Sequence, residues 1–250
     1  MKTTLKAALL LSLLIGCSKK DDVYIHNTGF VDLHDRPVGA SAAELLSSSK
    51  FTSVKIEVQY MTGYQPDAAA LNHLQTVLTS WLHKPAGITV VTKEIPASDK
   101  TTLSMDDVTR IELDNRTAFT NGTEMALYIL YTNSDYVNSN VLGVAYKNTS
   151  IVLFGKKIED NSGGIGQASR TKLVATVAEH EMAHLVGLVD NGSTMQTNHK
   201  DVQHGNHCNN RNCLMYYTAD TNDILGFLVT GNIPSLDANC YADLHANGGQ

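Results

Sequence analysis

Basic patches, internal repeats, low-complexity tracts and long apolar runs are all missing from this sequence of 250 residues. The formal net charge is −6 and 18% of the residues are charged, so the sequence argues against a nucleic-acid partner. Aromatic residues make up only 6%, and there are four cysteines. The hydrophobic share of 42% is that of an ordinary globular protein, and the length suits one medium domain or two small ones.

The N-terminal stretch MKTTLKAALLLSLLIGC is apolar but too short to span a membrane. Its end, LIGC at 14–17, resembles a bacterial lipobox, in which the cysteine is lipidated and becomes the new N-terminus. We therefore expect a lipoprotein signal peptide over 1–17 with the anchor on Cys17; an ordinary signal peptide with a chance cysteine is the alternative. The lysines and aspartates of residues 18–22 resemble the surface-export signal of Gram-negative lipoproteins. They predict a protein exposed on the bacterial outer membrane.

The rest of the chain divides by composition into an expected tether and an expected domain. Residues 18–50 are polar and rich in small side chains, which predicts a tether, and 51–250 form the expected folded domain. Hydrophobic patterning predicts strands at 55–60, 88–91, 125–131, 141–146 and 151–154. Helical spacing predicts helices at 66–83, 106–119, 170–188 and 236–246. Strands interleaved with helices predict a layered α/β domain.

Histidines are the main anomaly of the composition. Of ten in the chain, five fall in one short span: His180, His184, His199, His204 and His207. The first two belong to HEMAHLVG, residues 180–187, in an apolar segment typical of a buried helix. Buried ionisable groups need a partner, and a metal ion would be one. Histidines four apart share a helix face and can reach one Zn²⁺, with Glu181 beside them to take a proton from water. Two hydrogen-bonded core histidines are the structural alternative.

The same segment resembles the zinc motif of the metzincin metallopeptidases, in which a glycine, here Gly187, ends the helix and lets the chain return a third ligand. Glycine suits that turn because it adopts left-handed backbone conformations readily. Metzincins also place a methionine in a tight turn below the zinc, a position that Met215 fits. In some members the tyrosine two residues later binds the metal or steadies the oxyanion, which implies this role for Tyr217. Ordinary packing of Met215 and Tyr217 is the alternative.

Two residues compete for the third metal position. Asp190 lies three residues past Gly187, where some metzincins use aspartate, although Asp-Asn-Gly is also a good turn sequence. Residues 207–215, HCNNRNCLM, resemble the archaemetzincins, in which the third histidine is followed by Cys, four residues, Cys, one residue and Met. We favour His207 over Asp190, and His199 and His204 are lesser candidates.

The cysteines of this chain match the same family only in part. Archaemetzincins carry a second, cysteine-rich zinc site that ends in CxxC, but this chain has only Cys240 beyond Cys213, so we do not expect that site. In an oxidising compartment we expect instead a Cys208–Cys213 disulfide, with a pairing through Cys240 as the alternative.

The resemblance implies a mixed twisted sheet with an antiparallel edge strand, a zinc-binding active-site helix and a small C-terminal subdomain with the methionine turn. We expect a zinc endopeptidase with Zn²⁺ as cofactor and Glu181 as general base, which binds an extended protein or peptide along the 141–146 strand. We expect a monomer that meets the membrane through its lipid alone and binds no nucleic acid. The alternatives are a surface binding lipoprotein with a structural zinc, and an amidase or esterase that uses the same site.

Overall fold

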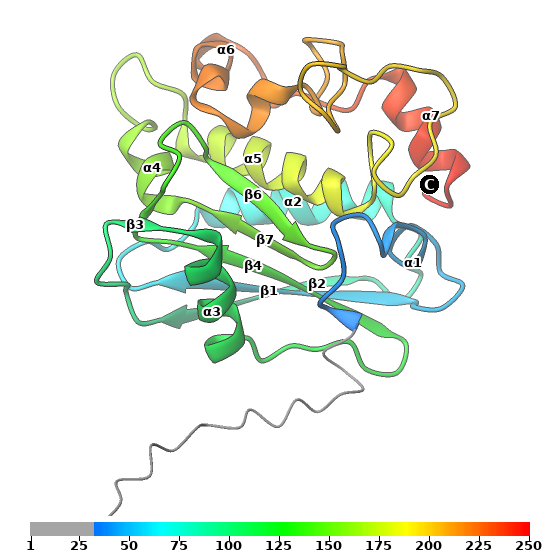
Figure 1. The fold of residues 1–250 in the computed structure, drawn as a ribbon, viewed down its shortest axis with the longest axis horizontal. Helices are drawn as coiled ribbons and strands as arrows, with labels where there is room; N and C mark the ends of the chain where they lie inside the picture. Colours follow the sequence, from blue (N-terminus) through cyan, green and yellow to red (C-terminus); the bar gives the residue numbers. More distant parts are fainter. Residues whose placement is uncertain (1–32) are drawn as a thin grey trace, which may run out of the picture.

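A computed structural model describes residues 33–250, which form a sheet with helices on both faces (Figure 1). Helices α2 and α5 cover one face and α3 the other, and the C-terminal segments lie over α5. This confirms the predicted α/β layering. The elements in chain order are α1 (Ala42–Leu46), β1 (Ser53–Met61), α2 (Ala68–Trp81), β2 (Ile88–Ile95), β3 (Thr102–Leu103), α3 (Met105–Asn115), β4 (Glu124–Tyr131), β5 (Asp135–Tyr136), β6 (Gly143–Lys147), β7 (Ser150–Leu153), α4 (Gly155–Asp160), α5 (Arg170–Leu185), η2 (Tyr217–Asp220), η3 (Asn222–Ile224), α6 (Leu225–Thr230) and α7 (Ala238–Ala246).

The main sheet has five strands in the order β2-β1-β4-β7-β6. The first four are mutually parallel, whereas β6 runs antiparallel to β7 at the edge. Strand β4 is buried from Met125 to Tyr131, because helices cover both faces of a parallel sheet and its strands become continuously apolar. The predicted edge strand is thus present as β6, and α5 packs beside it.

Two apolar layers flank the sheet. On the α2 and α5 side, Leu74 and Leu78 of α2 are buried with Val174 and Val177 of α5. The spacing of these residues puts them on the helix faces that meet the strands. On the opposite side, Val108 of α3 packs with residues that alternate to the other face of the strands, including Tyr128 and Phe154. The zinc-motif helix α5 is therefore held in the larger of the two apolar layers.

The expected tether, 18–50, is wrong from residue 34 onward. Leu45 and Leu46 of α1 are buried in the main core, and Lys84 Nζ donates hydrogen bonds to two main-chain carbonyls of this segment, those of Glu44 and Ser47. His34 is also buried and its Nδ1 lies 2.8 Å from Thr149 Oγ1. Most residues of this segment are small or polar, so its overall composition did not indicate that its two leucines are buried in the core. The expected signal peptide and Cys17 lie outside the described residues.

Within residues 33–250, no helix combines the length and the apolar character needed to cross a membrane.

Candidate metal centre

Helix α5 begins at a Ser169 cap, whose side chain accepts a hydrogen bond from the Lys172 N–H, and every residue from Leu173 to Leu185 is buried. It ends at Leu185, and Gly187, two residues further on, has a φ of +79°. A Cβ at this position would lie 2.5 Å from the Ser193 main-chain nitrogen, so only glycine allows the following loop to fold back so tightly. The expected helix-ending turn is therefore present at Gly187.

Three imidazoles meet at the C-terminal end of α5. His180 Nε2 lies 3.1 Å from His184 Nε2 and 3.2 Å from His207 Nε2. A tetrahedral zinc with bonds of about 2.0–2.1 Å would place its nitrogen ligands roughly 3.3 Å apart. The Nε2 atoms of the predicted histidines are thus spaced about as a single zinc ion would require. The loop after α5 brings His207 back to the two histidines of the helix.

The hydrogen bonds of these rings define which nitrogens face the centre. His180 Nδ1 lies 2.8 Å from Leu214 O and His207 Nδ1 lies 2.7 Å from His204 O. A carbonyl only accepts, so both Nδ1 atoms carry protons and, in the neutral rings, both Nε2 atoms present lone pairs. Burial lowers the pKa of His180 to about 4 and lowers the pKa values of His184 and His207 as well. These lowered pKa values favour the neutral form of the rings, which is the form that binds metals.

Glu181 points from α5 to the underside of β6. Its Oε2 accepts a hydrogen bond of 2.7 Å from the Ala145 N–H, whereas the buried Oε1 has no partner among residues 33–250. Burial, followed by the charge of Asp220, raises the pKa of Glu181 well above its usual range, against the Ala145 hydrogen bond. The strand comes this close because Gly143 lacks a side chain: a Cβ there would meet Val177 at 2.6 Å.

Met215 lies in a tight turn directly after Cys213, closed by a hydrogen bond from Tyr216 N–H to Cys213 O of 3.0 Å. The methionine side chain is fully buried, and its neighbour Leu214 supplies the carbonyl that orients His180. The Cys208 N–H donates to Met215 O at 2.7 Å, which joins the His207 loop to the turn. The turn therefore positions two of the three imidazoles.

Two of the predicted site residues lie away from the three imidazoles. Asp190 has an exposed side chain, in a left-handed conformation with a φ of 56°, and pairs with Lys200 at 3.3 Å. The ring of Tyr217 stacks on His204, with centroids 3.6 Å apart. Neither residue lines the cleft at the centre. The structure therefore favours the alternative interpretations, in which Asp190 belongs to a turn and Tyr217 packs against its neighbours.

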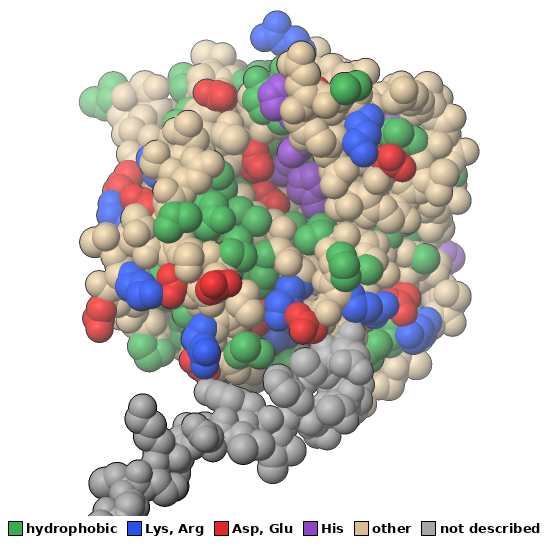
Figure 2. All heavy atoms as spheres, viewed as in Figure 1, with side chains coloured by type: hydrophobic (Ala, Val, Ile, Leu, Met, Phe, Trp, Pro, Cys, Tyr) green, Lys and Arg blue, Asp and Glu red, His purple; other side chains and the backbone are tan. Residues whose placement is uncertain are grey.

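A cleft of about 400 Å³ opens at the three imidazoles, between β6 and the loops that follow α5. Figure 2 shows acidic and histidine side chains side by side in a hollow of this face, next to a hydrophobic patch. Glu181, His184, His207 and Asp220 line the cleft together with Val141 and Gly143–Ala145. A larger cavity, of about 620 Å³, lies near α6 and contains none of the three imidazoles.

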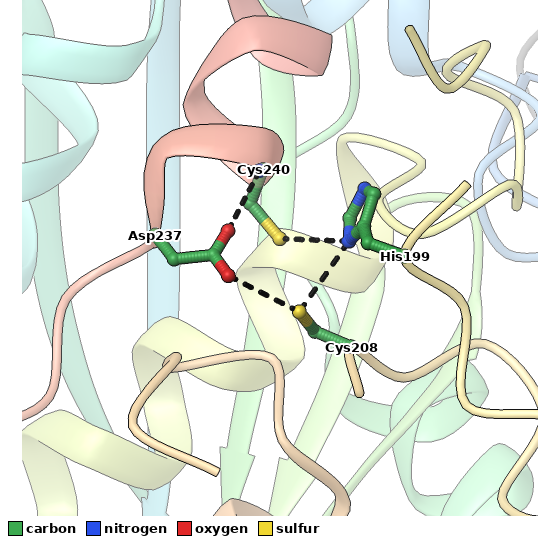
Figure 3. A group of neighbouring side chains, drawn as sticks. All are labelled: His199, Cys208, Asp237 and Cys240. Atoms are coloured by element: carbon green, nitrogen blue, oxygen red, sulfur yellow. Dashed lines mark hydrogen bonds between the residues drawn. The ribbon is translucent and has the colours of Figure 1, made fainter. Parts of the chain in front are cut away.

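A second group of side chains that could hold a metal, His199, Cys208, Asp237 and Cys240, lies at the start of α7, with ligand atoms within 4.8 Å of one another (Figure 3). His199 Nδ1 is 3.3 Å from Cys208 Sγ and 3.9 Å from Cys240 Sγ, and Cys213 Sγ is 3.5 Å from Cys240 Sγ. All three cysteines are buried free thiols. The expected Cys208–Cys213 disulfide is therefore wrong: all three sulfur atoms are free thiols, and those of Cys208 and Cys240 face His199.

Several groups around this second cluster orient its donors. Asp243 Oδ2 lies 2.7 Å from His199 Nε2, an arrangement typical of histidines whose other nitrogen binds a metal. The main-chain N–H groups of Met215 and Asp237 donate to Cys213 Sγ at 3.4 and 3.3 Å. Hydrogen bonds from Cys208, Cys240 and these N–H groups lower the pKa of Cys213 to about 4. The cluster therefore favours a thiolate, the form of cysteine that binds metals.

Sequence reasoning missed three residues here: Asp220 at the cleft, and Asp237 and Asp243 at the thiols. It considered His199 only as a lesser candidate for the first centre. Aspartates in unpatterned loops carry no spacing that marks them, and the pairing of Asp243 with His199 spans 44 residues. Only Asp237 carried a local signal, because it lies three residues before Cys240, at the position that caps α7.

No protein-family model matches this chain, and no curated protein matches it. Among solved structures, the fold is similar to the crystal structure of archaemetzincin from Methanopyrus kandleri, with a TM-score of 0.51 and 13% sequence identity. The similarity covers 78% of this chain and 96% of that chain. It shows a shared mixed α/β fold with parallel and antiparallel strands, and functional inference therefore depends on the side chains at the site.

Proposed function

We propose that this protein is a zinc-dependent endopeptidase whose metal is held by His180, His184 and His207. One observation carries the proposal: the Nε2 lone pairs of His180 and His207 face each other across 3.2 Å, and His184 Nε2 lies 3.1 Å from His180 Nε2. Such an arrangement is repulsive unless a cation lies at its centre. Asp190, the competing ligand, is left out because it pairs with Lys200 on the surface. The fold similarity to an archaemetzincin supports the same assignment.

The proton transfers belong to Glu181. Zinc in this site supplies Lewis-acid polarisation and lowers the pKa of a water towards about 7. The free Oε1 of Glu181 takes the proton from the attacking water and returns it to the leaving amine, while the Ala145 N–H holds Oε2 in place. Tyr217 has no part in this proposal because its ring stacks on His204 instead of facing the imidazoles.

The substrate is proposed to be an extended peptide segment laid along β6. This strand is the antiparallel edge of the sheet, and Val141 to Ala145 border the cleft beside Glu181. Strand addition satisfies backbone groups of any sequence, so it suits a general peptidase. An amidase or esterase acting on small substrates would not need this edge, and hydrolysis of short non-peptide amides without hydrolysis of unfolded proteins would favour that alternative.

We further propose that the second cluster holds a structural zinc through Cys208, Cys213, Cys240 and His199. Three sulfur atoms and one imidazole are a common ligand set of closed structural zinc sites. His199 and Cys208 come from the two sides of His207, Cys213 from the methionine turn and Cys240 from α7, so the ion would fasten the loop that carries His207. Here His199 takes part where the archaemetzincin pattern has a further cysteine.

The location of the protein is also a proposal, based on the LIGC segment alone. We propose lipidation at Cys17 and display on the outer membrane surface, with residues 18–32 as the tether to the domain. Metabolic labelling with a fatty acid tests the anchor: wild-type protein should be labelled and Cys17→Ala should not. Protease treatment of intact cells then tests surface display.

The experiment that tests the proposed function combines metal analysis with a proteolysis assay on chain lacking residues 1–17. We expect hydrolysis of an unfolded protein such as casein, inhibition by a chelator and recovery with zinc. His207→Ala should lose one zinc and the activity, whereas Asp190→Asn, which keeps a residue that tolerates positive φ, should keep both. Zinc lost only in Asp190→Asn would move the third ligand to Asp190. A zinc-loaded protein without hydrolytic activity would favour the surface binding lipoprotein with structural zinc.

A further inference from the structure

One acidic side chain at the cleft has no role in the chemistry described above. Asp220, the last residue of η2, lines the cleft opposite α5. One carboxylate oxygen of Asp220, one of Glu181 and a ring nitrogen of His180 all lie within 4.8 Å of one another. The Oδ1 atom of Asp220 is buried and has no hydrogen-bond partner among residues 33–250. The ionised form of a carboxylate in this state is stabilised by a positively charged neighbour.

The position of Asp220 is fixed relative to the edge strand. Its main-chain carbonyl accepts a hydrogen bond of 2.7 Å from the Leu142 N–H. The next residue, Thr221, forms an antiparallel bridge with Val141, and the Asn222 N–H donates to Asn140 O at 3.0 Å. These contacts attach η2 to the beginning of β6. A peptide laid along β6 would therefore pass Asp220 next to the catalytic centre.

The charges of the cleft give Asp220 an effect on the substrate. No lysine or arginine lines the described cleft, and its lining residues other than the acidic groups and histidines, such as Val144 and Asn206, are uncharged. Three neutral imidazoles, a divalent ion and an ionised Glu181 would leave one net positive charge, which repels a cation. The carboxylate of Asp220 cancels this repulsion, and it is the one negative group lining the described cleft that has no part in the proposed chemistry. At this separation, in a partly buried site, one unit of charge changes binding strongly.

A second observation points to a ligand in the same space. The Oε1 atom of Glu181 is buried, lacks a partner and faces the cleft that Asp220 lines. Two carboxylates therefore converge on one volume that no lysine or arginine among residues 33–250 lines. We propose that Asp220 is a specificity-determining residue that selects substrates with a cationic group beside the scissile bond. The cation is a lysine or arginine side chain or the free N-terminal ammonium, and the inference rests on the peptidase function proposed above.

The test uses alanine-based heptapeptides, with one Lys, Gln or Glu placed at each position in turn and with acetylated or free N-termini. Cleavage is followed by mass spectrometry with zinc-loaded protein, and kcat/KM is compared between peptides. Binding of the same peptides is measured by fluorescence anisotropy with the same zinc-loaded proteins at low temperature, before hydrolysis begins. The comparison variants are Asp220→Asn and Asp223→Asn, which removes the same charge from an exposed position three residues away.

We expect wild-type protein to favour Lys over Gln about tenfold or more at one position, in kcat/KM and in Kd, with Glu least favoured. Asp220→Asn should abolish the preference, and Asp223→Asn should keep it. A preference for a free over an acetylated terminus, lost in the same variant, would assign the cation to the ammonium. Equal Lys and Gln values everywhere, or an unchanged ratio in Asp220→Asn, would overturn the inference while leaving the peptidase intact. If nothing is cleaved, the peptidase proposal fails, and the binding ratios still decide the role of Asp220.

Discussion

The Nε2 atoms of His180 and His207 lie 3.2 Å apart, although 27 residues separate the two histidines in the chain. The helix supplies only His180 and His184. The third imidazole is delivered by the loop after Gly187, which the Lys200–Cys208 bridge and the Cys208–Met215 hydrogen bond hold in place. The geometry of the centre therefore depends on the loop and the methionine turn as much as on the helix.

Replacement of the proposed base separates metal binding from catalysis. Glu181→Gln keeps the shape of the side chain but cannot accept a proton, and Glu181 is not one of the three imidazole donors. We expect the zinc content to stay at the wild-type value and kcat to fall at least a hundredfold, the usual contribution of a general base. Elemental analysis and casein hydrolysis check the two halves. Activity close to wild type would remove Glu181 from the mechanism.

Gly187 offers a test of the turn that ends α5. Gly187→Ala should destabilise the protein by about 2 kcal/mol or more, since left-handed alanine alone costs about 1–2 kcal/mol and the new Cβ would lie 2.5 Å from the Ser193 nitrogen. Gly163→Ala is the matched control: its φ is +80°, but nothing lies within 4 Å of a Cβ there. Urea denaturation should show the larger loss for Gly187→Ala. Equal losses would mean that the backbone conformation, and not the contact with Ser193, limits this position.

The sequence predicted the features that depend on neighbouring residues along the chain, and it missed those that depend on contacts between distant elements. Periodic apolar residues predicted α5 and the edge strand, because burial on one face is a local property of the chain. The His-Glu-x-x-His spacing located three site residues, since one helix positions them all. The tether was wrong because Leu45 and Leu46 find their partners in distant elements.

The thiols show the limit most clearly. An oxidising compartment suggested a disulfide between Cys208 and Cys213, but the third sulfur comes from Cys240 of α7, 27 residues after Cys213, and His199 lies nine residues before Cys208. No local pattern records that convergence. Asp220 was missed for the same reason, because its meeting with Glu181 depends on how η2 attaches to β6.

The second cluster predicts a second zinc. We expect about two zinc ions per wild-type chain, about one in Cys240→Ser, and weaker retention in Asp243→Asn, because loss of an orienting carboxylate typically weakens metal binding 10–100-fold. Cys240→Ser should also lower the thermal midpoint, since the ion joins three segments. Thiol counting after chelation in denaturant should find three free cysteines in chain lacking residues 1–17. A count of one would indicate a disulfide and contradict the metal assignment.

Glu179 predicts a pH-dependent stability. Its side chain is almost fully buried on α5 beside His73, with 2.6 Å between Oε1 and Nδ1, and burial raises its pKa to about 7 against the His73 hydrogen bond. A raised carboxyl pKa means that the folded protein binds more protons than the unfolded chain between about pH 4.5 and 7. The free energy of unfolding therefore decreases as the pH rises through this window, by about 3 kcal/mol at most.

Glu179→Gln isolates this contribution, because glutamine keeps the hydrogen-bonding shape and cannot ionise. Urea denaturation at pH 5.5 and pH 8 should show the variant gaining stability relative to wild type as the pH rises, since only wild type must bury a charge at pH 8. Glu94→Gln removes an exposed carboxylate and should leave the wild-type pH dependence unchanged. If wild type and Glu179→Gln lose stability in parallel, the ion pair with His73 offsets the burial of Glu179, and the pH dependence of this fold originates at other groups.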